Sequence, residues 1–216
     1  MNSESSLLIH VVVCDDHAVV RRGISNTLTE ASDIRVTGEA GSYAELRELL
    51  RQVRCEVLVL DLGMPGRGGL EVLESLQAEA SQIRVLVVSM YPEDQYALRC
   101  LRAGAHGYVS KARDPAELIS AVRAVFHGRK HLTPEVAQLL VDSLSRPQPE
   151  TLHATLSARE LQTLTRIASG KRLADIAEEL LLSPKTVSVY RSRLLEKLHL
   201  SNNAELTVYA IRNELV

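Results

Sequence analysis

Residues 57–70 read Val57-Leu-Val-Leu-Asp61-Leu-Gly-Met-Pro-Gly-Arg-Gly-Gly-Leu70. Four apolar residues are followed at once by an aspartate and a glycine-rich stretch, and helical spacing begins at Leu70. A short apolar run bounded by turn residues is typical of a strand that is buried on both faces of a sheet. The stretch therefore predicts a strand, a loop that begins with a carboxylate, and a helix.

The same alternation continues through the first part of the chain. Four further β-branched runs lie at Ile9–Cys14, Arg35–Ala40, Arg84–Ser89 and Gly107–Val109. Segments with helical spacing lie between and after the runs, at Val19–Glu30, Tyr43–Val53, Leu70–Glu79, Glu93–Ala103 and Pro115–His127. Strands and helices in strict turn indicate a parallel sheet that helices cover on both faces. We therefore expect residues 8–127 to form an α/β doubly wound domain with a five-stranded parallel sheet.

The rest of the chain changes to helices only. A helix is expected at Pro134–Leu144 with Thr133 as its N-cap, and a polar segment with two prolines follows it. Four more helices are expected, at Ala158–Ser169, Leu173–Leu181, Pro184–Leu198 and Ala204–Asn213. The tight step between the second and third of these predicts a helix-turn-helix. We therefore expect a linker helix and linker at 128–154 and a small all-α helix-turn-helix domain at 155–216.

Composition and charge limit the class of protein. Of the 216 residues, 45% are hydrophobic and 24% are charged, which is typical of a globular protein and excludes a disordered or fibrous chain. No apolar run approaches the roughly 20 residues that cross a bilayer, and the amino-terminal residues carry no signal-peptide pattern. The three cysteines (Cys14, Cys55 and Cys100) form no close pair, which argues against disulfides and zinc. We expect a cytoplasmic protein without a membrane segment.

Three aspartates follow strands that are neighbours in such a sheet. Asp15 and Asp16 end the first strand and Asp61 ends the third. In a sheet with strand order 2-1-3-4-5, the three carboxylates converge at the switch point where ligands bind. Like charges this close need protonation or a cation, and hard oxygen ligands suit Mg²⁺. Ser89 ends the fourth strand and Lys111 follows the fifth, at the same end of the sheet.

These five residues together point to one chemistry. A carboxylate nucleophile, a metal ion, a hydroxyl group and a lysine are the groups that phosphoryl transfer to an aspartate requires. A single aspartate after a strand is ordinarily a turn or cap residue, so the argument depends on all five at one end of one sheet.

Several segments of the chain resemble the receiver domain of bacterial two-component response regulators. They match in order and spacing over about residues 8–127, and they are Asp15-Asp16, Asp61 to Leu70, Val87-Val-Ser89 and Gly107-Tyr-Val-Ser-Lys111. The resemblance implies that Asp61 accepts the phosphoryl group. It implies a Mg²⁺ site made by Asp15, Asp16, Asp61 and the backbone carbonyl of Gly63.

The same resemblance implies roles for residues of the fourth and fifth strands. Ser89 and Lys111 would hold the phosphoryl group, and Tyr108 would be the switch aromatic that turns into space vacated when Ser89 moves. Three positions differ from the usual pattern: Ala112 replaces a frequent proline, Met90 is bulky, and Gly63 has no side chain to orient an attacking water. His17, directly after the acid pair, is expected to cap a helix or line the cleft rim rather than bind metal.

The helix expected at Pro184–Leu198 has one apolar and one polar side. At about 100° per residue, Val187, Leu194 and Leu198 share the side that must be core. The opposite side gathers cations, hydroxyls and one branched apolar residue, namely Lys185, Ser188, Val189, Ser192, Arg193 and Glu196. Cations and serines suit phosphates and base edges, and Val189 suits a thymine methyl. Arg191, at the edge of the core side, is expected to contact a phosphate.

The carboxyl-terminal part also resembles a known family. The matching segments are Leu156-Ser-Ala-Arg-Glu-Leu161, Ile176-Ala, Leu182-Ser-Pro-Lys-Thr-Val187 and Lys197-Leu198. They resemble the LuxR-type DNA-binding domain over about residues 152–216, and with the receiver the chain resembles the NarL/FixJ response regulators. Tyr190 stands where histidine is frequent in that family. The resemblance implies that the last helix carries a dimer contact.

We therefore expect a DNA-binding response regulator and not an enzyme, beyond Mg²⁺-dependent self-phosphorylation from a phosphodonor and self-dephosphorylation. Its partners would be a sensor histidine kinase, double-stranded promoter DNA and a second copy of the chain. Residues 155–216 hold nine Lys and Arg against seven Asp and Glu, whereas residues 1–154 hold 16 against 20. This asymmetry indicates two modules with different partners.

Two alternatives stay open from the sequence. A haloacid-type phosphatase also uses an aspartate nucleophile, but it needs a second aspartate two residues later, where this chain has Gly63. A receiver that acts only through protein partners would use the carboxyl-terminal domain as an adaptor, which the polar side of the helix at Pro184–Leu198 argues against.

Overall fold

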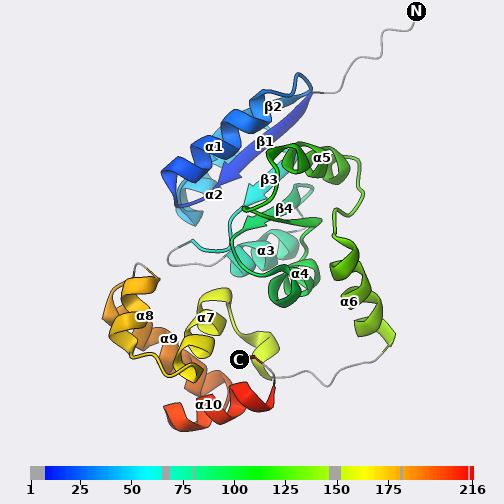
Figure 1. Ribbon diagram of the computed structural model, residues 1–216. Helices are drawn as coiled ribbons and strands as arrows, with labels where there is room; N and C mark the ends of the chain where they lie inside the picture. The colour runs from blue at the N-terminus through cyan, green and yellow to red at the C-terminus, as the bar shows by residue number, and fades with distance from the viewer. Residues whose placement is uncertain (1–7, 65–68, 80, 146–151, 181, 214) are drawn as a thin grey trace, which may run out of the picture. The chain divides into compact units, whose positions relative to one another are not determined.

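The computed structural model describes residues 8–64, 69–79, 81–145, 152–180, 182–213 and 215–216. The chain divides into two compact units, Met1–Pro147 and Gln148–Val216. The first unit is α/β, and the regular elements in the described part of the second unit are all helices (Figure 1).

The first unit is built on a five-stranded parallel sheet. Its strands are β1 (Ile9–Cys14), β2 (Ile34–Ala40), β3 (Val57–Leu60), β4 (Arg84–Ser89) and β5 (Gly107–Ser110). They pair in the order β2-β1-β3-β4-β5. The helices that alternate with them are α1 (Ala18–Thr29), α2 (Tyr43–Gln52), α3 (Gly69–Ala78), α4 (Glu93–Arg102) and α5 (Pro115–Phe126). This is the doubly wound sheet that the sequence predicts.

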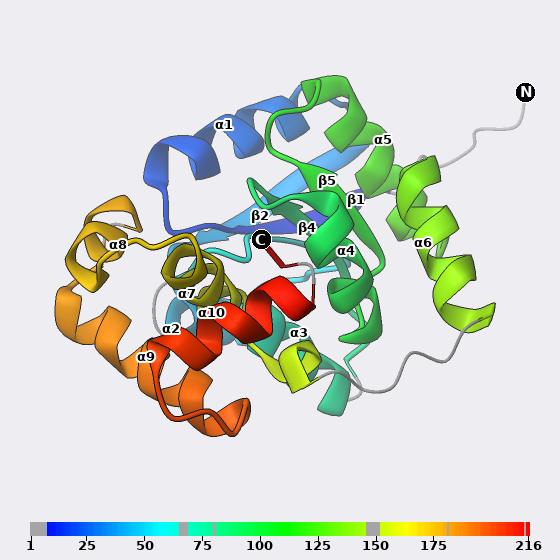
Figure 2. The same cartoon turned by 60° about the horizontal axis from the view of Figure 1, so that its bottom comes forward.

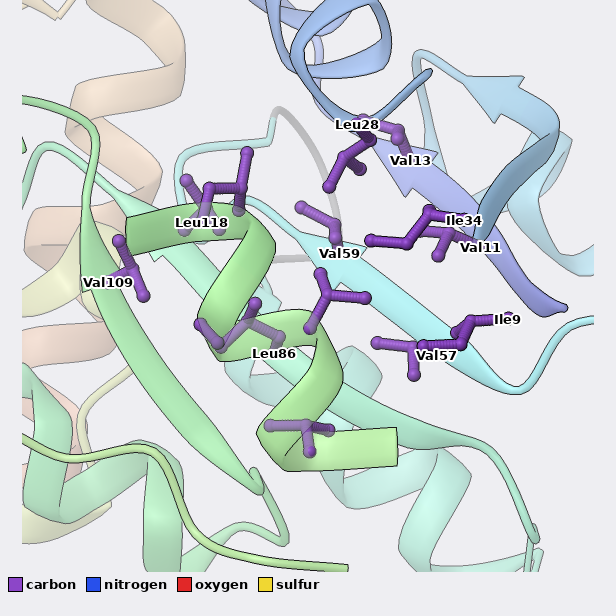
Figure 3. Close-up of a cluster of buried hydrophobic side chains, with 14 of the residues drawn as sticks. Ile9, Val11, Val13, Leu28, Ile34, Val57, Val59, Leu86, Val109 and Leu118 are labelled. Atoms are coloured by element: carbon purple, nitrogen blue, oxygen red, sulfur yellow. The ribbon is translucent and has the colours of Figure 1, made fainter. Parts of the chain in front are cut away.

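The sheet is buried on both faces, as the apolar runs require. On one face, α1 and α5 pack on residues of all five strands, in a cluster that includes Val11, Val59, Leu86 and Leu118 (Figure 3). The intervening strand residues point to the other face. Most of those in β1, β3 and β4 are also buried, and α2, α3 and α4 contribute further buried side chains, among them Leu46, Leu73 and Ala97. A sheet covered in this way leaves only its strand ends for chemistry.

Helix α6 (Pro134–Ser145) belongs to the first unit. Thr133 caps it, as the sequence predicts: its Oγ1 accepts a hydrogen bond from the Val136 N–H at 3.3 Å. The helix packs against α4. Just before it, His131 forms a parallel β-bridge with Gly107 at the free edge of β5.

The second unit contains a short 3₁₀ helix, η1 (Leu152–Thr155), and then α7 (Ala158–Ala168), α8 (Leu173–Glu179), α9 (Pro184–Lys197) and α10 (Asn203–Arg212). A capping box of Ser157 and Glu160 begins α7. Helix α7 packs on α9 and α10, and α8 packs on α9, so the helix-turn-helix pair α8–α9 rests on a small core. Fully buried residues of that core include Leu164, Ile176, Leu194 and Leu206.

Candidate functional site

The strand register brings the predicted acidic residues to one end of the sheet. Cys14 of β1 pairs with Leu60 of β3, and each strand is followed directly by an aspartate. The Asp61 N–H donates to the Cys14 carbonyl at 2.9 Å, which continues the ladder by one residue and holds Asp61 beside Asp15. The sheet therefore fixes the distance between these two carboxylates.

The four residues Asp15, Asp16, His17 and Asp61 each offer one ligand atom, and these atoms all lie within 4.8 Å of one another. Asp15 and Asp61 are buried, with 1% and 4% exposure. Burial raises the pKa of Asp61; Lys111 opposes this rise and the charge of Asp15 adds to it. A cluster that makes ionisation unfavourable favours a bound cation.

Lys111 is the cation that this cluster already contains. Its Nζ lies 2.7 Å from Asp15 Oδ2 and 3.1 Å from Asp61 Oδ1, and its side chain is almost fully buried. The Lys111 N–H donates to the Ser89 carbonyl at 2.9 Å, so the end of β4 positions the lysine. The buried ammonium group and the two carboxylates carry opposite charges, and they attract one another strongly at these distances because little water screens them.

Two residues near Asp15 that the sequence did not single out as ligands hold it in place. Arg21 Nη1 donates to the Asp15 carbonyl at 2.6 Å, and the His17 N–H donates to Asp15 Oδ1 at 2.8 Å. His17 stands at the N-cap of α1, but its side chain makes no capping hydrogen bond. The ring lies beside Asp16 instead, with Nδ1 2.8 Å from Oδ1, so it lines the rim of the cluster. The contact between Arg21 and Asp15 becomes visible only in the folded structure, where α1 packs on the sheet.

The glycine-rich segment after Asp61 has a steric explanation at Gly69. A Cβ at this position would lie 2.6 Å from the Asp61 carbonyl oxygen and 2.7 Å from Leu62 Cα. Both are backbone atoms, so glycine allows α3 to begin directly against the loop that carries Asp61. Beneath it, Cys14 donates to the Met64 sulfur at 3.2 Å, and burial raises the pKa of the Cys14 thiol to about 12, which leaves it unreactive.

Ser89 and Tyr108 meet at the loop that follows β4. The buried Ser89 Oγ accepts from the Tyr91 N–H at 3.3 Å, and the Tyr108 hydroxyl donates to the Tyr91 carbonyl at 2.8 Å. Tyr108 is 1% exposed, so the ring already lies inside the protein. The resemblance implied a switch aromatic that turns into space vacated when Ser89 moves. Burial raises the pKa of Tyr108 strongly, which keeps its hydroxyl a donor. Met90, by contrast, is 67% exposed beside the cluster.

In the second unit, α9 has the two sides that its sequence predicts. Val187 and Leu194 are buried, and Tyr190 is buried with them at 6% exposure. Tyr190 is thus a core residue. Lys185, Ser188, Val189, Ser192 and Arg193 are all exposed. Arg191 is partly buried, and its Nε donates to Asn203 Oδ1 at 2.6 Å, which ties α9 to the start of α10.

The parallel sheet with its acidic cluster and lysine, followed by a helix-turn-helix, has the architecture of a receiver-type regulator with a DNA-binding module. The family models agree. Residues 11–123 match the response regulator receiver domain, and residues 154–210 match the LuxR family of bacterial regulatory proteins.

Curated relatives match nearly the whole chain. The response regulator GacA of Pseudomonas protegens is 38% identical over 209 residues, which is 97% of this chain and 98% of the relative. The response regulator UvrY of Escherichia coli K12 is 36% identical over 209 residues, 96% of each chain. The chain therefore belongs to the two-component response regulators of the NarL/FixJ type, with a receiver domain and a LuxR-type DNA-binding domain.

Solved structures agree with this family. A structure titled as two RcsB dimers bound to two parallel DNAs is 27% identical, covers 94% of this chain and 97% of its own, and has a TM-score of 0.58. The response regulator ChrA of a heme-sensing two-component system is 30% identical and has a TM-score of 0.51. The match covers 97% of this chain and 100% of the ChrA chain. In the part of the chain that the structure describes, no helix is both long and apolar enough to span a bilayer.

Proposed function

We propose that the chain is a transcriptional regulator that is switched by phosphorylation of Asp61. One observation carries the proposal: the buried Asp61 carboxylate lies 3.1 Å from Lys111 Nζ and shares a cluster with Asp15 and Asp16. A buried nucleophile flanked by a cation and by metal-binding carboxylates is the arrangement that phosphoryl transfer to aspartate uses.

The donor set fits Mg²⁺. Asp15, Asp16, Asp61 and the Gly63 carbonyl would hold the ion, and all of them offer the hard oxygen atoms that Mg²⁺ prefers. When bound, the ion would neutralise negative charge on the transferred phosphoryl group.

In the proposed step, an Asp61 carboxylate oxygen attacks the phosphorus of a phosphohistidine on a sensor histidine kinase, or of a small phosphodonor. The bond from phosphorus to the donor nitrogen or oxygen breaks, its electron pair leaves with the donor, and an acyl phosphate forms on Asp61. Lys111 and the Ser89 hydroxyl would hold phosphoryl oxygens. Attack of a water molecule on the acyl phosphate would return the carboxylate of Asp61. Gly63 has no side chain that could orient this water.

The output would come from the second unit. We propose a receiver at 8–127, a linker at 128–154 and a DNA-binding domain at 155–216, with phosphorylation favouring a homodimer on promoter DNA. The residues proposed to contact DNA are Lys185, Ser188, Val189, Arg191, Ser192 and Arg193. The similar solved structure of RcsB dimers bound to DNA supports this output. Promoter DNA is in the cytoplasm, so we expect the protein there.

Acetyl phosphate and Mg²⁺ test the acceptor directly. The wild-type protein is expected to show a retarded band on a phosphate-affinity gel, whereas Asp61→Asn shows none. Asp142→Asn is the matched control, because Asp142 is an exposed carboxylate on α6 and should leave the shift intact. A shift that persists in Asp61→Asn would reject Asp61 as the acceptor.

DNA binding tests the output against the protein-only alternative. The phosphorylated wild type is expected to bind promoter fragments more tightly than the unphosphorylated protein does. If the phosphorylated protein binds no duplex at any salt concentration, the second unit acts as an adaptor for proteins instead.

A further inference from the structure

The chain between α5 and α6 lies against the free edge of β5. The Tyr108 N–H donates to the His131 carbonyl at 3.1 Å, and the His131 N–H donates to the His106 carbonyl at 3.1 Å. A Cβ on Gly107 would lie 2.9 Å from the His131 oxygen, so glycine here allows the close approach. His131 thus extends the sheet by one residue, beside the strand that carries Tyr108.

Two contacts then hold the start of α6 on α4. Thr133, 6% exposed, caps α6 and also donates through its Oγ1 to Glu93 Oε2 at 3.2 Å. Val136 is 2% exposed, and α6 runs beside α4 (Figure 2). Further along the helix, Leu139 and Val141 are exposed. One hydrogen bond to a charged group and one buried valine make a contact of modest strength.

Charged side chains connect this contact to α5. Arg113 Nη2 lies 3.5 Å from Glu93 Oε2, and Arg113 Nη1 lies 3.6 Å from Glu117 Oε2. Glu117 Oε1 in turn lies 3.5 Å from His131 Nε2. Glu93 is therefore the shared partner of the linker residue Thr133 and of Arg113, which follows β5.

The same glutamate lies four residues after Ser89, which is proposed to hold a phosphoryl oxygen. Glu93 comes two residues after Tyr91, whose N–H donates to Ser89 and whose carbonyl accepts from Tyr108. Arg113 comes two residues after Lys111. A movement of about 1 Å in the loop from Ser89 to Glu93 would lengthen the 3.2 Å hydrogen bond to Thr133 beyond a useful distance.

We propose that residues 131–145 form a latch, which Glu93 holds on α4 while Asp61 is unphosphorylated and releases once Asp61 carries phosphate. The inference rests on the phosphorylation of Asp61 proposed above. A phosphoryl oxygen would take the Ser89 hydroxyl as a donor, and the loop with Glu93 would follow Ser89 away from Thr133. Release would uncover the α4 surface and free the helix that precedes the second unit in the chain.

Hydrogen–deuterium exchange of the full chain, read by mass spectrometry of peptides from α6, tests the latch without phosphate. Glu93→Ala is expected to speed exchange in α6 about tenfold, because a hydrogen bond to a charged group is lost. Asp94→Ala is the matched control: Asp94 is an exposed carboxylate in the same turn of α4 and should leave exchange unchanged. Thr133→Val should speed exchange at least as much as Glu93→Ala, because it also removes the cap of α6, and Thr133→Ser, which keeps the hydroxyl, should exchange as slowly as wild type.

Acetyl phosphate and Mg²⁺ test the release. Exchange in α6 is expected to rise about tenfold in wild type and to stay unchanged in Asp61→Asn. If α6 exchange is unchanged or slower in wild type whose intact mass shows the phosphate, the release is overturned. Equal exchange in Glu93→Ala and Asp94→Ala overturns the latch itself. If the wild type takes up no phosphate, the proposed function is overturned. The comparison of Glu93→Ala with Asp94→Ala still tests the contact between Glu93 and Thr133, because it needs no phosphate.

Discussion

The ammonium group of Lys111 lies closer to Asp15, at 2.7 Å, than to the proposed phosphoacceptor Asp61, at 3.1 Å. Lys111 therefore neutralises Asp15, one of the two acids proposed to bind metal, as well as the proposed acceptor Asp61. A divalent ion bound by the acid pair would take over that first task. The lysine would then be available for phosphoryl oxygens, which connects metal binding to the chemistry of Asp61.

Replacing Lys111 should expose this dependence on a cation. In EDTA, Lys111→Met is expected to lower the free energy of unfolding by about 3 kcal/mol, since two buried carboxylates lose their counter-charge. Mg²⁺ should restore much of the loss, because an ion that binds only the folded state stabilises it. Urea denaturation with EDTA or with Mg²⁺ measures both effects.

Lys130→Met is the control for that experiment. Lys130 donates to the Ala105 carbonyl at 2.7 Å, and its loss should change stability equally with and without Mg²⁺. Unfolding of Lys111→Met that does not respond to Mg²⁺ would show that the acid pair binds no ion.

Two glycines of the first unit should respond in opposite directions to alanine. Gly69→Ala is expected to cost about 2 kcal/mol or more, because its methyl group would meet backbone atoms of Asp61 and Leu62 that cannot yield. Gly23→Ala is expected to gain about 0.5–1 kcal/mol, since Gly23 is an exposed residue within α1 with nothing near its Cβ position. Urea denaturation measures the difference. A neutral Gly69→Ala would mean that the loop after Asp61 can move aside.

The ion pair between Asp33 and Arg123 predicts a dependence on pH. Two hydrogen bonds of 2.7 and 2.8 Å from Arg123 lower the pKa of Asp33. A carboxyl whose pKa is lower in the folded protein contributes stability above its unfolded pKa and loses it as the pH falls through the folded pKa. Both side chains are partly exposed, so Asp33→Asn should cost at most about 1 kcal/mol at pH 7.

That cost should disappear only in strongly acidic buffer, below the lowered pKa that Asp33 has in the folded protein, where wild type and variant carry the same charge at this position. Thermal unfolding of both proteins across the acidic range checks it. A difference that stays constant with pH would assign the effect to packing instead of charge.

The sheet and the site could be predicted from sequence because their signals are local. The bounds of β1, β3 and β4 match the apolar runs residue for residue, and the helix ends differ by only one or two residues, where the last turn frays. The carboxyl ends of parallel strands then bring Asp15 and Asp61 together without further information.

Contacts between distant segments could not be predicted. Periodicity says that Arg21 lies on α1, but only the packed helix shows its Nη1 at the Asp15 carbonyl. Likewise, the hydrogen bond between Thr133 and Glu93 joins residues 40 positions apart, and neither residue differs in type from many exposed ones. The buried hydroxyl of Tyr108 donates to the backbone carbonyl of Tyr91. Every residue has a backbone carbonyl, so the sequence gives no sign of which one the tyrosine reaches.

The exposed side of α9 gives a prediction for DNA binding that needs no knowledge of the promoter. Each phosphate contact that is lost lowers the slope of log K against log salt by about 0.9. Lys185→Ala and Arg193→Ala should each lower it by about that amount on any duplex, because both cations are exposed on α9. Arg212→Ala, which removes an exposed cation at the end of α10, should leave the slope unchanged. Fluorescence anisotropy at several salt concentrations measures it, and equal slopes for all four proteins would mean that DNA meets another surface.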